Sequence, residues 1–119
     1  MASNRVTGDG MQTVGSADFD SVVLGAAGPV TVEFMSYSCA HCRAIESALQ
    51  EVAQAVAPQQ QIVRVNIALE QELAAQYGVQ GTPTLLMFLN GNEIARVEGP
   101  PPDAASLLRV VTQPYESLQ

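Results

Sequence analysis

Apolar residues follow two different periods in the first half of the chain. They are nearly continuous over Val30–Met35 and dense again over Gln61–Ile67, which is typical of strands that a sheet buries. Between these runs, apolar residues recur at intervals of three and four, which predicts a long amphipathic helix that begins near Cys39. This stripe consists of Ile45, Ala48, Leu49, Val52, Ala53 and Val56. The pattern therefore predicts a strand, a helix and a parallel strand joined by a right-handed crossover.

The second half of the chain has the pattern of a hairpin. An apolar run over Thr84–Leu89 ends at Asn90-Gly91, the strongest short turn signal in the sequence, so Glu93–Glu98 is expected to return antiparallel. Gly99 and three prolines then end the sheet. Shorter helices are predicted over residues 17–26, with Ser16 as N-cap, over 70–77 and over 103–112.

This order of elements predicts one α/β domain, with a mixed central sheet of four to five strands and helices on both faces. A chain of 119 residues with 47% hydrophobic content is large enough to bury a single core. We expect the domain to cover residues 13–113, between a flexible tail over residues 1–12 and a frayed tail over residues 114–119. A short edge strand is predicted near Met11–Val14.

The charge balance argues against two classes of partner. Twelve carboxylates stand against five arginines, no lysine is present, and the net charge is −7. Such a chain repels phosphate backbones and anionic bilayers, so we expect no nucleic acid and no membrane as partners. Without a run of about 18 apolar residues or a signal peptide, the sequence favours the cytoplasm, although a chain with its leader removed would look the same. We expect a monomer.

Two cysteines, Cys39 and Cys42, stand three residues apart at the predicted junction of strand and helix. A disulfide between them would close too short a loop to stabilise the fold, which favours a chemical role. The helix N-terminus stabilises an anion, so Cys39 is the predicted attacking thiolate. Cys42, one turn further, is the predicted resolving thiol, which attacks the mixed disulfide formed on Cys39.

Two other residues are candidates for this chemistry. His41 lies between the cysteines, where an imidazolium or a hydrogen-bond donor would favour the Cys39 thiolate, unless it is a surface histidine without a role. Glu33 interrupts the apolar run of its strand, and burial would suit it to accept the proton of Cys42. The alternative is that Glu33 faces solvent at the edge of the sheet.

These residues resemble the thioredoxin superfamily over most of the chain. The resemblance rests on Val32-Glu33-Phe34, Cys39-Ala40-His41-Cys42-Arg43, Gly81-Thr82-Pro83-Thr84, Asn90-Gly91 and Gly99. It implies a thioredoxin fold and a thiol-disulfide oxidoreductase that acts on protein disulfides through a Cys39–Cys42 disulfide, with no other cofactor. Thioredoxin reductase or glutathione would supply the electrons.

The same resemblance implies a substrate-binding surface. Pro83 matches the cis-proline of the family, which lies opposite the cysteines, and Thr82 would pair with a substrate strand through its backbone. Gly81 and Gly99 match small residues beside the substrate groove, and Tyr37 and Ser38 complete the expected set. Ser38 and Met35 stand where thioredoxins usually carry tryptophan.

Three readings remain open on the sequence. A disulfide reductase is the leading interpretation. An oxidase or isomerase is the alternative, because His41 and Thr82 match residues that such enzymes of this superfamily carry. An adaptor or chaperone that keeps the scaffold without redox activity is the second class. Metal binding is the third, but structural zinc needs four ligands and the chain has one cysteine pair, so no metal site is predicted.

Overall fold

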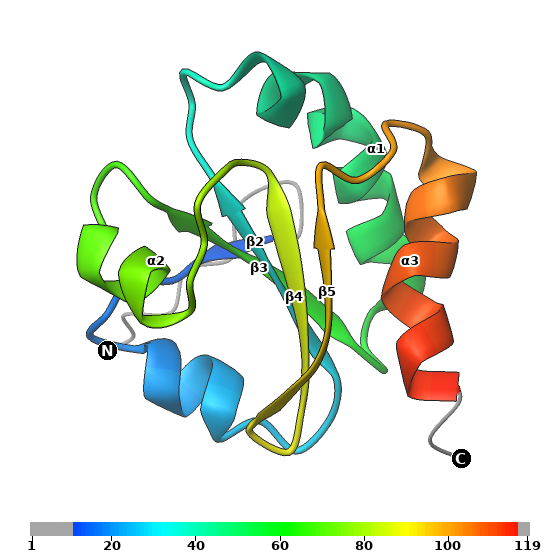
Figure 1. Cartoon of the computed structure of the whole chain (residues 1–119). Helices are drawn as coiled ribbons and strands as arrows, with labels where there is room; N and C mark the ends of the chain where they lie inside the picture. The colour runs from blue at the N-terminus through cyan, green and yellow to red at the C-terminus, as the bar shows by residue number, and fades with distance from the viewer. Residues whose placement is uncertain (1–10, 117–119) are drawn as a thin grey trace.

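A five-stranded mixed sheet forms the centre of the molecule in a computed structural model that describes residues 11–116 (Figure 1). The strand order is β1-β3-β2-β4-β5. Strand β3 is parallel to both β1 and β2, whereas β4 is antiparallel to β2 and β5. This confirms the predicted crossover and hairpin. The strands are β1 (Gln12–Thr13), β2 (Val30–Met35), β3 (Gln61–Asn66), β4 (Thr84–Leu89) and β5 (Asn92–Glu98).

Helices cover both faces of this sheet, as the sequence predicts. The long helix α1 and the last helix α3 lie on one face, and the helical turn η1 and the short helix α2 lie on the other (Figure 1). Their bounds are η1 (Asp20–Leu24), α1 (Ala40–Val56), α2 (Gln71–Gln76) and α3 (Ala104–Glu116). Within residues 11–116, none of the helices combines the length and apolar content needed to cross a bilayer.

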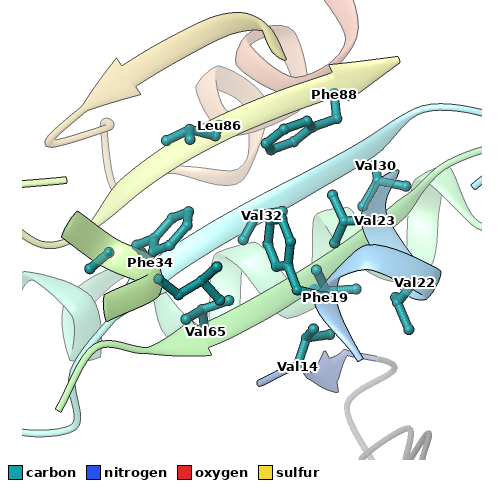
Figure 2. Close-up of a cluster of buried hydrophobic side chains, with 13 residues drawn as sticks. Val14, Phe19, Val22, Val23, Val30, Val32, Phe34, Val65, Leu86 and Phe88 are labelled. Carbon is teal, nitrogen blue, oxygen red and sulfur yellow. The ribbon is translucent and has the colours of Figure 1, made fainter. Parts of the chain in front are cut away.

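Two hydrophobic cores form because successive side chains of a strand point to opposite faces. Val32 and Phe34 of β2 belong to the core under η1 and α2, where Figure 2 shows them facing Phe19. Glu33 and Met35 of the same strand consequently face α1, on the side of the second core. Strand β2 thus presents apolar side chains to η1 and α2, and presents the carboxylate of Glu33 to the helix that carries the cysteines.

The first helix differs from its prediction. Only residues 20–24 are helical, as one π-helical turn in which the Gly25 N–H donates to the Asp20 carbonyl at 2.8 Å. Ser16 is not the N-cap. Its N–H donates to the Glu70 side chain at 3.1 Å, and the Asp18 side chain accepts from the Gly15 N–H at 2.9 Å. The local hydrogen bond of Asp18 and the long-range one to Glu70 hold residues 15–18 in a turn instead of a helix.

The C-terminal helix ends later than predicted, whereas the N-terminal edge strand lies where it was expected. Helix α3 extends to Glu116, so the assignment of residues 114–116 to a frayed tail is wrong. The reason is that Tyr115 is buried and its hydroxyl lies 3.1 Å from the Val30 carbonyl and 3.0 Å from the Phe88 carbonyl. At the other end, β1 confirms the edge strand, and Met11 is fully buried. Residues 1–10 of the predicted tail, and residues 117–119, lie outside the described residues.

Candidate active site

Cys39 is the N-cap of helix α1, a position that serine, threonine or aspartate often fills. Its Sγ accepts a hydrogen bond from the Cys42 backbone N–H at 3.1 Å, which satisfies one of the free amide groups of the first turn. The same Sγ lies 3.4 Å from the Thr82 carbonyl oxygen, to which the thiol donates. The first cysteine therefore occupies the anion-binding end of α1, as predicted.

The surroundings of Cys39 favour its ionised form. Burial acts to raise the pKa of Cys39, but hydrogen bonds from the side chains of Cys42 and Thr82 and from the backbone N–H groups of Cys42 and His41 outweigh it. The net effect is a pKa below the ordinary value. Cys39 is thus the cysteine that is suited to attack as a thiolate near neutral pH.

Cys42 has the opposite character. It lies on the buried face of α1 and is 2% exposed. Burial raises the pKa of Cys42 to about 11, and the hydrogen bond to the Cys39 side chain adds to this effect. Cys42 is consequently a protonated thiol at neutral pH, and it needs a proton acceptor before it attacks a mixed disulfide.

The loop before β4 faces the cysteines. Its Thr82–Pro83 peptide bond is cis, as the resemblance implied. Pro83 is buried, and its carbonyl accepts a hydrogen bond from the Gly99 N–H at 3.0 Å, which joins this loop to the end of β5. A hollow of about 160 Å³ opens between the two segments, and its lining includes Gly81, Thr82, Pro83 and Gly99. The four predicted groove residues therefore lie around one depression.

His41 is placed beside this depression, next to Gly99. Its Nε2 donates to the Pro100 carbonyl at 2.9 Å. A Cβ on Gly99 would come within 3.8 Å of the His41 ring, so the imidazole lies close over that glycine. The contribution of His41 to the lowered pKa of Cys39 comes from its backbone N–H.

Glu33 is fully buried in β2, and this strand lies between β3 and β4. The alternative in which Glu33 faces solvent at a sheet edge is therefore wrong. Its neighbour in register on β3 is Arg64, which is 4% exposed and donates to Glu46 of α1 at 2.8 Å. Glu33 and Arg64 thus lie beneath α1, on the side of the sheet that faces Cys42.

Sequence reasoning missed the Arg64–Glu46 pair. The signal was the same as for Glu33, because Arg64 is a charged residue within an apolar strand. Its Nη2 also lies 3.3 Å from the Sδ of Met11. The pair joins β3 to the helix that carries the cysteines.

The loop between β2 and α1 carries the remaining candidates. Tyr37 is 59% exposed, and Ser38 is exposed with its Oγ at 2.9 Å from the Oγ of Ser36. Both residues immediately precede Cys39, at the rim of the site. Within the described part of the chain, no group of three or more histidine, cysteine or acidic side chains could hold a metal ion.

The amino-acid sequence of the chain is similar to those of known proteins. The family model described as Thioredoxin matches residues 10–113. The chain is 36% identical to a thioredoxin of Haemophilus influenzae over 86 residues, which cover 72% of this chain and 80% of the relative. It is 36% identical to a thioredoxin of Rhodospirillum rubrum over 85 residues, or 71% and 82% of the two chains. For thioredoxin 1 of Synechococcus elongatus the identity is 35% over 89 residues, or 75% and 83%.

Proposed function

The chain belongs to the thioredoxin family, and we propose that within this family it serves as a protein-disulfide reductase. As a member it is a thiol-disulfide oxidoreductase, which exchanges its cysteine pair with protein disulfides. The redox group is the Cys39–Cys42 pair itself, without a bound cofactor. The proposal concerns the direction of electron flow and the roles of individual residues.

The reaction begins when the Cys39 thiolate attacks one sulfur of a substrate disulfide. A bond forms between Cys39 and that sulfur, and the other substrate cysteine leaves as a thiolate that takes up a proton. Cys42 then loses its proton to Glu33, directly or through a water molecule, and attacks the Cys39 sulfur. The second substrate cysteine is released, and the enzyme retains the Cys39–Cys42 disulfide. The burial of Glu33 on the side of the sheet that faces α1 supports this role.

A substrate strand lies along the Thr82–Pro83 loop in this proposal. Backbone groups of Thr82 pair with the substrate, which requires no particular side chain and so suits many protein disulfides. The small residues Gly81 and Gly99 leave room for the substrate beside the hollow that they line. Tyr37 and Ser38, both exposed and directly before Cys39 in the chain, are the residues that we expect to contact the substrate on the other side of Cys39.

We infer the direction of electron flow from one observation, the hydrogen bond of the His41 ring. A stabilised thiolate favours the reduced pair and makes the disulfide a stronger oxidant. The His41 ring, which would add to this stabilisation, instead donates to Pro100 at 2.9 Å. The Cys39 thiolate is then left with backbone donors, of which the Cys42 N–H lies 3.1 Å from the sulfur. This supports a reductant over the oxidase or isomerase that the same histidine suggested.

The reduction potential of the Cys39–Cys42 pair, measured at equilibrium with glutathione, tests this proposal. We expect a value near that of thioredoxin, about −270 mV, and a value between about −180 and −120 mV would refute the reductase assignment. His41→Ala should move the potential by less than about 15 mV, because the ring is bound elsewhere. Reduction of insulin disulfides should require Cys39, so Cys39→Ser serves as the inactive control.

We further propose thioredoxin reductase as the electron donor and the cytoplasm as the compartment. The most direct measurement supplies NADPH and thioredoxin reductase, or glutathione and its reductase, and follows insulin reduction with each. Faster turnover with glutathione would contradict the proposed donor.

A further inference from the structure

The segment that joins β5 to α3, orange in Figure 1, has few backbone groups that could hold it in position. Pro100, Pro101 and Pro102 follow one another there, and proline has no backbone N–H. Carbonyl oxygens are therefore the only backbone groups through which these residues can be hydrogen-bonded. The His41 ring supplies the donor for one of them, because its Nε2 lies 2.9 Å from the Pro100 carbonyl. A side chain of the first turn of α1 thus holds the proline segment to the helix that carries the cysteines.

Gly99 connects this contact to the substrate groove. Its N–H donates to the Pro83 carbonyl at 3.0 Å, and its φ of +59° suits a residue without a side chain. The Cε1 of His41 lies 3.8 Å from the position that a Cβ on Gly99 would occupy. The ring therefore lies against Gly99 and is hydrogen-bonded to Pro100. These two successive residues link α1 to the loop before β4.

A third contact between the helix and this loop changes during the reaction. The Cys39 thiol donates to the Thr82 carbonyl at 3.4 Å. A thiolate, or a Cys39 sulfur joined to a substrate, has no proton to donate, so this hydrogen bond is lost when the enzyme reacts. The hydrogen bonds of His41 and Gly99 involve no atom that takes part in sulfur exchange. These two hydrogen bonds therefore remain to hold the groove while a substrate is attached.

We propose that His41 is a positioning residue of the substrate groove. Its ring fixes the distance between Cys39 and the Thr82–Pro83 loop, which an extended polypeptide contacts while its disulfide reacts. The inference rests on the proposed function, because it concerns how protein disulfides bind. A small disulfide reaches Cys39 without contacting the loop, so its reaction does not need the hydrogen bond to Pro100. The role is thus specific for polypeptide substrates.

The chemistry of the imidazole ring suits this role without requiring a charge. The imidazolium and the neutral tautomer with a proton on Nε2 both donate from that nitrogen. Glutamine carries an amide nitrogen at a similar reach, phenylalanine keeps a ring over Gly99 but has no donor, and alanine has neither. Substitution of His41 by these three residue types therefore separates the hydrogen bond from the packing of the ring.

A comparison of a protein disulfide with a small disulfide tests the proposal. Reduced enzyme is mixed with insulin or with hydroxyethyl disulfide, and formation of the Cys39–Cys42 disulfide is timed over a range of concentrations. For His41→Ala we expect the half-saturating concentration of insulin to rise about two- to tenfold, which is the effect of one lost hydrogen bond, while the rate at saturation changes little. At low concentrations, the ratio of the insulin rate to the small-disulfide rate should fall by the same factor.

Variants at the same position identify the responsible group. His41→Gln should restore the wild-type ratio, whereas His41→Phe should resemble His41→Ala. Gln54→Ala, on the exposed face of α1, is the control for substitution in this helix. An equal loss of rate with both disulfides in His41→Ala would mean that the ring acts on Cys39 itself, and would overturn the inference, as would no change in either rate. If insulin did not oxidise the wild type, the proposed function itself would fail.

Amide hydrogen exchange tests the same contact without a substrate. Exchange of the Gly99 N–H, followed by NMR, should be about two- to tenfold faster in His41→Ala and near the wild-type rate in His41→Gln. The Val32 amide in β2 should keep its wild-type rate, which separates a local effect from a general loss of stability. Wild-type exchange at Gly99 in His41→Ala would refute the proposed link between the His41 ring and the groove.

Discussion

Replacing Glu33 with glutamine tests whether a buried carboxylate accepts the proton of Cys42. With a pKa of about 11, about one Cys42 in ten thousand is ionised at pH 7. In the mixed disulfide the effects of Cys39 on this pKa disappear while burial remains, so the ionised fraction there is higher. A positioned base typically contributes about 10²- to 10⁴-fold. We therefore expect Glu33→Gln to slow resolution at pH 7 by roughly 10²-fold or more.

The rate of resolution should depend on pH more steeply in Glu33→Gln than in the wild type. In the variant, Cys42 must ionise without help, so the resolution rate should rise about tenfold per pH unit until the pH approaches the pKa of Cys42. In the wild type, Glu33 accepts the proton, and the resolution rate should depend much less on pH. The advantage of the wild type should consequently shrink as the pH increases from 6 to 9.

The assay follows one turnover. A peptide with a fluorophore is attached to Cys39 as a mixed disulfide, and its release on attack by Cys42 is timed. Glutamine keeps the size of the side chain, and Glu51→Gln on the exposed face of α1 is the matched control. If Glu33→Gln released the peptide at the wild-type rate with the wild-type pH slope, Glu33 would not be the proton acceptor.

Three further outcomes are expected. At pH 7, Cys39 in a Cys42→Ser variant should be alkylated at least about 100-fold faster than Cys42 in a Cys39→Ser variant, and similar rates would contradict the assigned roles. Tyr115→Phe should lower the free energy of unfolding by about 1–3 kcal/mol in urea titrations, with exposed Tyr37→Phe unchanged. Gly91→Ala should cost about 1–3 kcal/mol in the same titration, because φ is +83° and a Cβ would lie 2.9 Å from a backbone oxygen. Wild-type stability in either variant would argue against these contacts.

The strands and the hairpin were predictable because their signals are local. The apolar run of Val30–Met35 identifies a strand without reference to its neighbours, and Asn90-Gly91 adopts the positive φ values, 52° and 83°, that its residue types favour. The end of α3 was not predictable in this way. Tyr115 extends that helix through a hydrogen bond to Val30, 85 residues away. The spacing of apolar residues along the chain does not reveal such a long-range contact.

The same distinction applies to the site. The positions of Cys39 and Cys42 followed from their spacing at a strand–helix junction. The burial of Glu33 depends on the strand order, which places β2 between β3 and β4 and which the sequence does not state. The orientation of His41 depends on Pro100, 59 residues further along the chain. Arg64 was marked by its charge within an apolar strand, but its pairing with Glu46 was not predictable because Glu46 lies on α1.

The hydrogen bond between the two cysteines accounts for only a small part of the range of reduction potentials found among such enzymes. With two residues between them, the Cys42 N–H reaches the Cys39 sulfur at 3.1 Å, so the thiolate replaces the usual serine or aspartate cap of α1. A cap contributes about 0.5–2 kcal/mol, and 1.4 kcal/mol corresponds to about 30 mV for this two-electron couple. Loss of the cap on oxidation therefore raises the potential by about 10–40 mV. The gap between thioredoxin and its most oxidising relative is about 150 mV, so the helix cap alone leaves the pair near the reducing end.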